Sequence, residues 1–205
     1  MKVKTRLQMT LVALMLAASG AHAQVYVGAG GGYALGKLGT SGTSNFISSF
    51  VASPTITQVT DDNALGWKVF LGYDYNQNLG FEFGYANLGQ YGTTSVTAIP
   101  STIVGQVKAS TWYWDVLGKV PVTTGVSLYG RLGLTYYQAN NTLGGITKLT
   151  DEAMGWKGGL GAQFDVTKKI ALRGEWEYYG NMGSNTDGIG KLDVHLFNAQ
   201  ILWKF

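Results

Sequence analysis

The sequence predicts an all-β protein, an eight-stranded antiparallel up-and-down transmembrane β-barrel, and three of its features lead to this fold class. Apolar or aromatic residues alternate with polar ones in about eight segments, as strands require because successive side chains point to opposite faces. An export signal precedes these segments, and the last of them ends on an aromatic residue, Phe205. In lipid all backbone N–H and C=O groups must be paired within the protein, and a closed barrel achieves this with strands.

Residues 1–23 have the features of a cleaved secretory signal peptide. Three basic residues precede a short apolar stretch, 7–18, and Ala-His-Ala at 21–23 offers small residues at the cleavage site. The alternative is a membrane anchor, but the apolar stretch is shorter than the roughly 20 residues that a spanning helix needs. We therefore expect residues 24–205 to form the mature protein, as one outer membrane barrel domain.

The charge balance and the lack of cysteine narrow the function classes. Three of the 15 basic residues lie in the signal, which leaves 12 basic and 12 acidic residues and no net charge. This balance argues against a nucleic-acid partner. Without cysteine an exported protein has no disulfides, so its stability must come from barrel closure and burial in lipid.

The alternation places eight strands and two kinds of connection. The predicted strands are 24–35, 64–75, 79–88, 107–120, 126–140, 152–165, 170–179 and 192–205. Short connections at 76–78, 121–125 and 166–169 alternate with long ones near 36–62, 89–105, 141–151 and 180–191. This pattern is typical of outer membrane barrels with extracellular long loops and periplasmic termini. A soluble barrel is the alternative, but Trp and Tyr share the outward, apolar parity and cluster near strand ends, as interfacial girdles do.

Charged residues occupy the opposite, inward parity. They are Lys68, Glu82, Asp115, Arg131, Lys157, Arg173, Glu175 and Glu177. An unpaired charge away from water is costly, so we expect salt bridges among them in the narrow interior of the barrel. Two interpretations remain open: a polar plug that holds the strands in register, or a gate in which Glu82 exchanges partners and opens a narrow water path.

Catalysis has little support in the sequence. His195 is the only histidine after the signal, it has outward parity, and no nucleophile motif surrounds it. No metal-ligand spacing and no cofactor motif are present, so we expect no catalytic, metal or cofactor site. A lipid-modifying enzyme is the weakest of the functional hypotheses.

The first long connection carries an apolar stripe. Phe46, Ile47, Phe50 and Val51 have the spacing of one face of a short helix. This stripe either packs on the rim of the barrel or forms a surface patch for a host molecule, another cell or a lipid head group.

Four glycine-aromatic segments suggest a family. They are Val25–Gly30, Gly80–Tyr85, Leu128–Gly133 and Ala171–Trp176. With them, the chain resembles the OmpA/OmpX-like eight-stranded outer membrane barrels of Gram-negative bacteria, without their periplasmic peptidoglycan-binding domain, so cell-wall tethering is not expected.

The resemblance implies particular residues. In that family an interior Glu pairs with an interior Arg or Lys, and Glu82 and Arg173 stand where that pair would be. Asp115 replaces the family's interior Lys of the fourth strand, and Gln163 replaces an interior Glu of the sixth, so a rearranged network is expected.

The end of the chain also resembles the recognition signal of the barrel-assembly machinery. This signal would consist of Phe197, Ile201, Trp203 and Phe205.

Together these features predict an integral outer membrane protein with a structural and surface-interaction role through its long loops. The alternative is a small low-conductance pore gated by interior salt bridges. The expected partners are outer membrane lipid and lipopolysaccharide, the assembly machinery, and a possible extracellular ligand of the loops.

Overall fold

The computed structural model describes residues 24–38, 55–59, 63–98, 101–143, 147–182 and 192–205. The expected signal peptide and the apolar stripe of Phe46, Ile47, Phe50 and Val51 lie outside these residues. Among the described residues, no helix has the length and hydropathy needed to cross a membrane.

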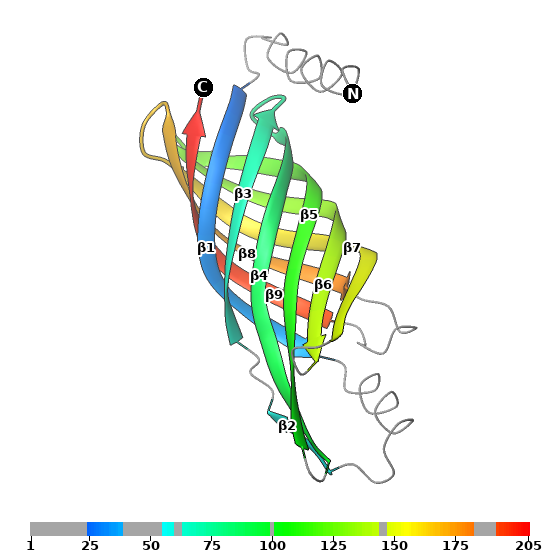
Figure 1. Ribbon diagram of the computed structural model, residues 1–205. Coiled ribbons are helices and arrows are strands. Elements are labelled where there is room, and N and C mark those ends of the chain that lie inside the picture. The colour runs from blue at the N-terminus through cyan, green and yellow to red at the C-terminus, as the bar shows by residue number, and fades with distance from the viewer. Residues whose placement is uncertain (1–23, 39–54, 60–62, 99–100, 144–146, 183–191) are drawn as a thin grey trace, which may run out of the picture.

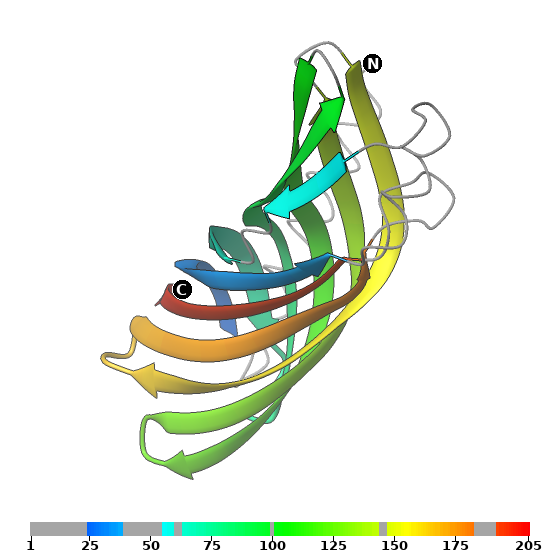
Figure 2. The same cartoon turned by 90° about the horizontal axis from the view of Figure 1, so that it is seen from below.

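Eight of the strands form a closed antiparallel barrel, which confirms the predicted fold class (Figure 1). The strands are β1 (Gln24–Leu38), β2 (Thr55–Val59), β3 (Asn63–Asp74), β4 (Leu79–Ala98), β5 (Ser101–Thr123), β6 (Val126–Leu143), β7 (Thr147–Asp165), β8 (Ile170–Met182) and β9 (Leu192–Lys204). The ring runs β4–β3–β1–β9–β8–β7–β6–β5, and pairing of β5 with β4 closes it. Figure 2 shows β1 beside β9, so the first and last strands of the barrel are neighbours.

Most of the strands are longer than the sequence predicted. Two of the predicted long loops are wrong, because most of their residues lie in strands. Most of 89–105 continues β4 and β5 as a paired hairpin, and 141–151 largely continues β6 and β7. The short strand β2, which was not predicted, pairs with the β4 extension. The three threonines of 93–97 suit a strand as well as a solvated loop, so their polarity did not distinguish the two.

A β-bulge marks where β4 changes its pairing. The register to β5 shifts between Asn87 and Gly89, and Gly89 has a φ of 95°, which a residue with a Cβ rarely adopts. The Asn87 side chain accepts a hydrogen bond of 2.9 Å from the Gly89 N–H and so stabilises the bulge. Beyond this point β4 and β5 project, with β2, past the ends of the other strands (Figure 1).

Short connections gather at the opposite end of the barrel, together with both termini of the described chain. In the β3–β4 turn the Asn76 side chain accepts hydrogen bonds from the backbone N–H groups of Asn78 and Leu79, each 2.8 Å long. The N–H of Phe205 donates to the carbonyl of Val25 at 3.0 Å, which fixes the two termini side by side. We call this the short-turn end, and the other the long-connection end.

The two faces of the barrel are opposite to those of a soluble barrel. Large apolar side chains point outward and are exposed, among them Trp67, Phe83, Trp114, Leu132, Trp156 and Trp203. Charged and tyrosine side chains fill the interior. This distribution excludes the soluble alternative, because its exterior would be polar.

Glycines on the inward face make room for the large interior side chains. A Cβ on Gly72 would lie 2.1 Å from the Tyr26 ring, and one on Gly161 would lie 2.5 Å from the Tyr129 ring. Alternating small and large residues therefore fill the interior, as small barrels require.

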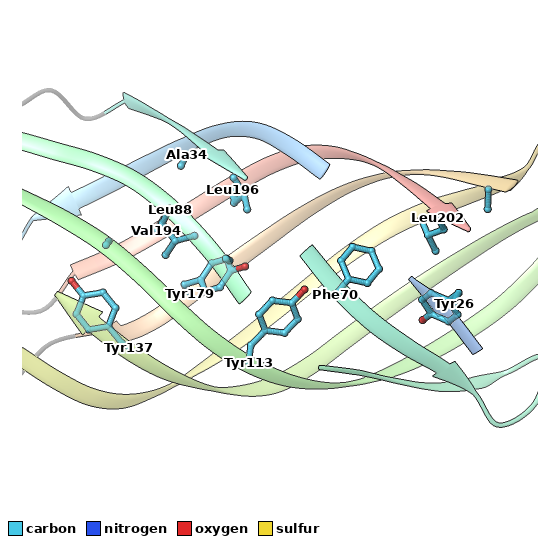
Figure 3. Close-up of a cluster of buried hydrophobic side chains, with 13 residues drawn as sticks. Tyr26, Ala34, Phe70, Leu88, Tyr113, Tyr137, Tyr179, Val194, Leu196 and Leu202 are labelled. Carbon is cyan, nitrogen blue, oxygen red and sulfur yellow. The ribbon is translucent and has the colours of Figure 1, made fainter. Parts of the chain in front are cut away.

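The interior is layered along its length (Figure 3). Ala34, Leu88, Val194 and Leu196 gather towards the long-connection end, whereas Tyr26 lies near the short-turn end. The charged residues begin directly beside this apolar group, because Glu177 lies opposite Leu196 in the sheet.

Candidate functional site

The candidate site is an ion-pair network at the centre of the barrel. Six strands, β3 to β8, supply its side chains by the same alternation that exposes their apolar neighbours. All eight charged residues selected from the sequence are buried there: Lys68, Glu82, Asp115, Arg131, Lys157, Arg173, Glu175 and Glu177.

Arg131 is the hub of this network, because its guanidinium contacts four carboxylates. Its Nη1 donates hydrogen bonds to Asp115 Oδ2 at 3.0 Å and to Glu177 Oε1 at 3.2 Å. Its Nη2 lies 3.0 Å from Glu82 Oε2 and 2.9 Å from Glu175 Oε2. A planar group with five N–H donors can serve several carboxylates at once, whereas an ammonium group is a point charge.

The structure brings together Glu82 and Arg173, the pair that the family resemblance implied. Arg173 Nη1 contacts Glu82 Oε1 directly, and the Tyr26 hydroxyl donates to the same oxygen at 2.8 Å. Arg173 Nε donates to the Gln163 side-chain oxygen at 2.8 Å. Gln163, at a position where the family was expected to carry a Glu, therefore supplies a neutral acceptor.

Two lysines complete the central network. Lys68 pairs with Glu175 and lies 3.0 Å from Glu177. Lys157 pairs with Glu177 and lies 2.9 Å from Asp115. Asp115 stands where the family's interior lysine of the fourth strand was expected, and two cations face it, Arg131 from β6 and Lys157 from β7.

Interior tyrosines also belong to the network and were not predicted, although their inward parity in the sequence identifies them. The Tyr129 hydroxyl donates to Glu175 Oε2 at 2.6 Å, and the Tyr179 hydroxyl donates to Glu177 Oε2 at 3.2 Å. Lys157 Nζ lies 3.8 Å from the centre of the Tyr113 ring, a cation–π contact. Tyrosine therefore supplies both the apolar filling and part of the hydrogen bonding.

Further ion pairs extend the network to the short-turn end. Lys119 pairs with Asp74, and Lys204 Nζ lies 2.7 Å from Asp165 Oδ1. Asp165 also accepts a hydrogen bond of 2.8 Å from Gln163, which connects this end to Arg173 and the centre. These pairs were not predicted, because their members lie at strand ends where the alternation is weakest.

An apolar layer follows the network towards the long-connection end. Leu88, Leu196 and Val194 are fully or almost fully buried there, with Thr111 and Tyr137 nearby on the same inward face. The described inward side chains of this layer carry no charge. A polar and an apolar obstruction thus lie in series along the barrel.

His195 points outward, as its parity predicted, into an aromatic cluster. Trp176 Nε1 donates to His195 Nδ1 at 3.2 Å, and the two rings stack at 5.9 Å. In the described part of the chain, no three His, Asp or Glu side chains are arranged to hold a metal ion.

The four residues expected to form the assembly signal all point away from the barrel interior. Phe197, Ile201, Trp203 and Phe205 are exposed at the outer surface of the last strand and its end. They alternate with buried Asn198, Gln200, Leu202 and Lys204.

Comparison with known proteins identifies the family. The model of the outer membrane protein beta-barrel domain matches residues 9–205, so the chain belongs to this family. It is 30% identical to outer membrane protein A of Klebsiella aerogenes over 151 residues, and 30% identical to that of Escherichia fergusonii over 155 residues. Each match covers 71% of this chain but only 40% and 42% of the relatives, so the chain spans less than half their length.

Solved structures show the same fold. Neisserial surface protein A superposes with a TM-score of 0.62 at 18% identity, over 88% of this chain and 97% of that one. The outer membrane protein OprG of Pseudomonas aeruginosa gives 0.54 at 13% identity, over 90% and 97%. The resemblance found in the sequence is thereby confirmed, and the chain is an outer membrane β-barrel protein.

The hub role of Arg131 leads to a stability prediction. Replacing Arg131 with Met leaves four buried carboxylates to three cations, and we expect the free energy of unfolding to fall by about 3–5 kcal/mol. The free energy of unfolding of Arg131→Lys should lie between those of the wild type and Arg131→Met, because an ammonium group cannot reach four carboxylates. The measurement is urea unfolding of the barrel refolded into lipid vesicles.

The matched control is Lys119→Met, which removes a single ion pair near the short-turn end. Its effect should be smaller than that of Arg131→Met. Equal losses from the two substitutions would contradict the hub assignment.

Proposed function

We propose that this protein is a closed, non-conducting barrel that anchors an interaction surface at the outside of the cell. The observation that carries the proposal is the filling of the interior by paired charges followed by an apolar layer. A water-filled path would require the paired groups to separate and the apolar layer to be wetted, and both are unfavourable.

The second candidate function is a small low-conductance pore. Glu82 favours it, because this carboxylate has two cation partners, Arg131 and Arg173, and could exchange between them. Such an exchange would loosen the polar part of the obstruction. It would leave Leu88 and Leu196 in place, so the closed barrel remains the preferred function.

The interaction surface is proposed at the long-connection end. The β2–β4–β5 projection extends the barrel on this side, and segments that a rigid scaffold positions commonly carry binding residues. The apolar stripe at Phe46, Ile47, Phe50 and Val51 remains a prediction for part of this surface. Lipopolysaccharide and an extracellular ligand are the proposed partners there.

Conductance separates the two functions. We expect the refolded wild type to be silent in planar bilayers, and Glu82→Ala to remain silent although less stable, because the apolar layer is intact. Combining Glu82→Ala with Leu196→Ser should produce conductance, since both obstructions are then weakened. The outward substitution Phe83→Leu is the control, and its conductance should equal that of the wild type. A conducting wild type whose open fraction changes in Glu82→Ala would establish the pore instead.

Orientation is tested by labelling, which the lack of native cysteine makes simple. With a membrane-impermeant maleimide, Ser101→Cys at the tip of the β4–β5 hairpin should react on intact cells. Gln77→Cys in the short β3–β4 turn should react only after the outer membrane is permeabilised. The reverse pattern would refute the proposed surface role.

The outward face of the last strand is proposed to engage the barrel-assembly machinery. Deletion of Phe205 should lower the outer membrane yield sharply, because the exposed terminal aromatic is lost. Lys204→Gln is the control: it removes one ion pair but keeps the aromatic end, so its yield should stay near that of the wild type. Quantitative immunoblots of outer membrane fractions provide the measurement, and equal yields would reject the signal.

A further inference from the structure

A groove crosses the outer surface of β5 to β9. Its volume is about 610 Å³, and its lining includes Gly118, Gly130 and Gly158 together with Leu132 and Leu160. The cross-strand register shows two adjacent rows, one from Gly118 through Gly130 and Leu160, the other from Leu132 through Gly158. Four steps between neighbouring strands span about 19 Å, so the groove is elongated across the strands.

The glycines of this groove differ from those inside the barrel. A Cβ on Gly118 would meet nothing within 4 Å, and one on Gly130 would come no closer than 3.5 Å to any atom. Packing within the barrel therefore does not require glycine at these positions, in contrast to Gly72 and Gly161. Their effect is to hollow the lipid-facing surface.

The groove ends at a polar group, His195. The rings of Trp156, Tyr178 and His195 make tilted contacts in series, with ring centres 5.2 and 5.1 Å apart. Because His195 Nδ1 accepts the hydrogen bond from Trp176, a neutral imidazole carries its proton on Nε2. An apolar groove is thus combined with one N–H donor at its end.

His195 also lies at the appropriate depth for an interfacial group. It precedes Lys204 by about 30 Å of strand. With a strand tilt of about 35–45°, this distance spans roughly the 25 Å of the apolar band. His195 is therefore near the edge of the membrane on the long-connection side.

We propose that the groove binds one acyl chain of lipid A, the membrane anchor of lipopolysaccharide, and that His195 Nε2 donates to an ester or hydroxyl oxygen at the polar end of this chain. The assignment to lipid A rests on the proposed outward orientation, which puts His195 in the outer leaflet. The elongated shape and the apolar lining of the groove suit a hydrocarbon chain. The N–H donor of His195 fixes which end of the groove receives the polar end of that chain.

The experiment uses native mass spectrometry of the full mature barrel in detergent micelles that contain either purified lipid A or phosphatidylethanolamine. Gly118→Leu fills the groove, and Gly174→Leu is its matched control. Gly174 is also an outward, exposed glycine whose Cβ would meet nothing within 4 Å, but it does not line the groove. His195→Phe keeps the aromatic ring and removes the donor.

We expect the wild type and Gly174→Leu to retain one lipid A molecule each. Retention should fall about tenfold in Gly118→Leu, the effect of displacing about two methylene groups from apolar contact. His195→Phe should also retain less than the wild type. Heat-modifiable gel mobility reports whether each variant is folded, and Gly130→Leu replaces Gly118→Leu if the latter does not fold.

Three results would overturn the proposal. Equal retention by all variants would mean that the lipid is ordinary annular lipid. Preferential retention of phosphatidylethanolamine would reject lipid A as the occupant. A dimer that is lost in Gly118→Leu would assign the groove to a second copy of the chain. Each leaves the labelling of Ser101→Cys unaffected, so a failure here is distinct from a failure of the proposed surface role.

Discussion

Charge neutralisation inside a narrow barrel is the constraint on which the rest of this structure depends. Eight strands enclose a space that side chains fill, so charges that point inward must find partners there. Six cations and six anions form these pairs: Lys68, Lys119, Arg131, Lys157, Arg173 and Lys204 with Asp74, Glu82, Asp115, Asp165, Glu175 and Glu177. Within the part of the chain that the structure describes, these pairs use 12 of the 24 charged residues of 24–205. The small number of charges in the sequence follows from the lipid-facing surface on the opposite parity.

Arg131 shows why a paired interior still needs a particular arrangement. The central carboxylates come from β4, β5 and β8, and they converge on one guanidinium from β6. A shift of register in any of these strands by one residue would turn its charges towards lipid, where they are strongly unfavourable. The network therefore connects strands that are not all neighbours in the sheet, and it favours one register over its alternatives.

The sequence predicted what depends on a two-residue period and missed what depends on the relation between strands. Alternation alone identified the eight strands, both faces and the eight central charges. It could not single out Arg131. The contact of this side chain with four carboxylates depends on the register of strands across the barrel and on the length of the arginine side chain. It also treated Thr93 and Thr94 as loop residues, since a β-branched polar residue suits a solvated strand extension equally well. The ion pairs of Lys119 and Lys204 lie near strand ends. Too few alternating residues remain there for the two-residue period to show which side chains point inward.

The arrangement of obstructions in series bears most directly on function. A gate built on Glu82 and Arg173 would control only the polar layer, because Leu88, Val194 and Leu196 lie beyond it towards the long-connection end. Ions must lose hydration to pass an apolar constriction, and no side chain in the described part of that layer offers a charge in compensation. Rearrangement of one ion pair therefore changes the stability of the barrel before it changes its permeability. We therefore propose that the interior holds the strands together and that interactions with other molecules take place at the outer surface and the long-connection end.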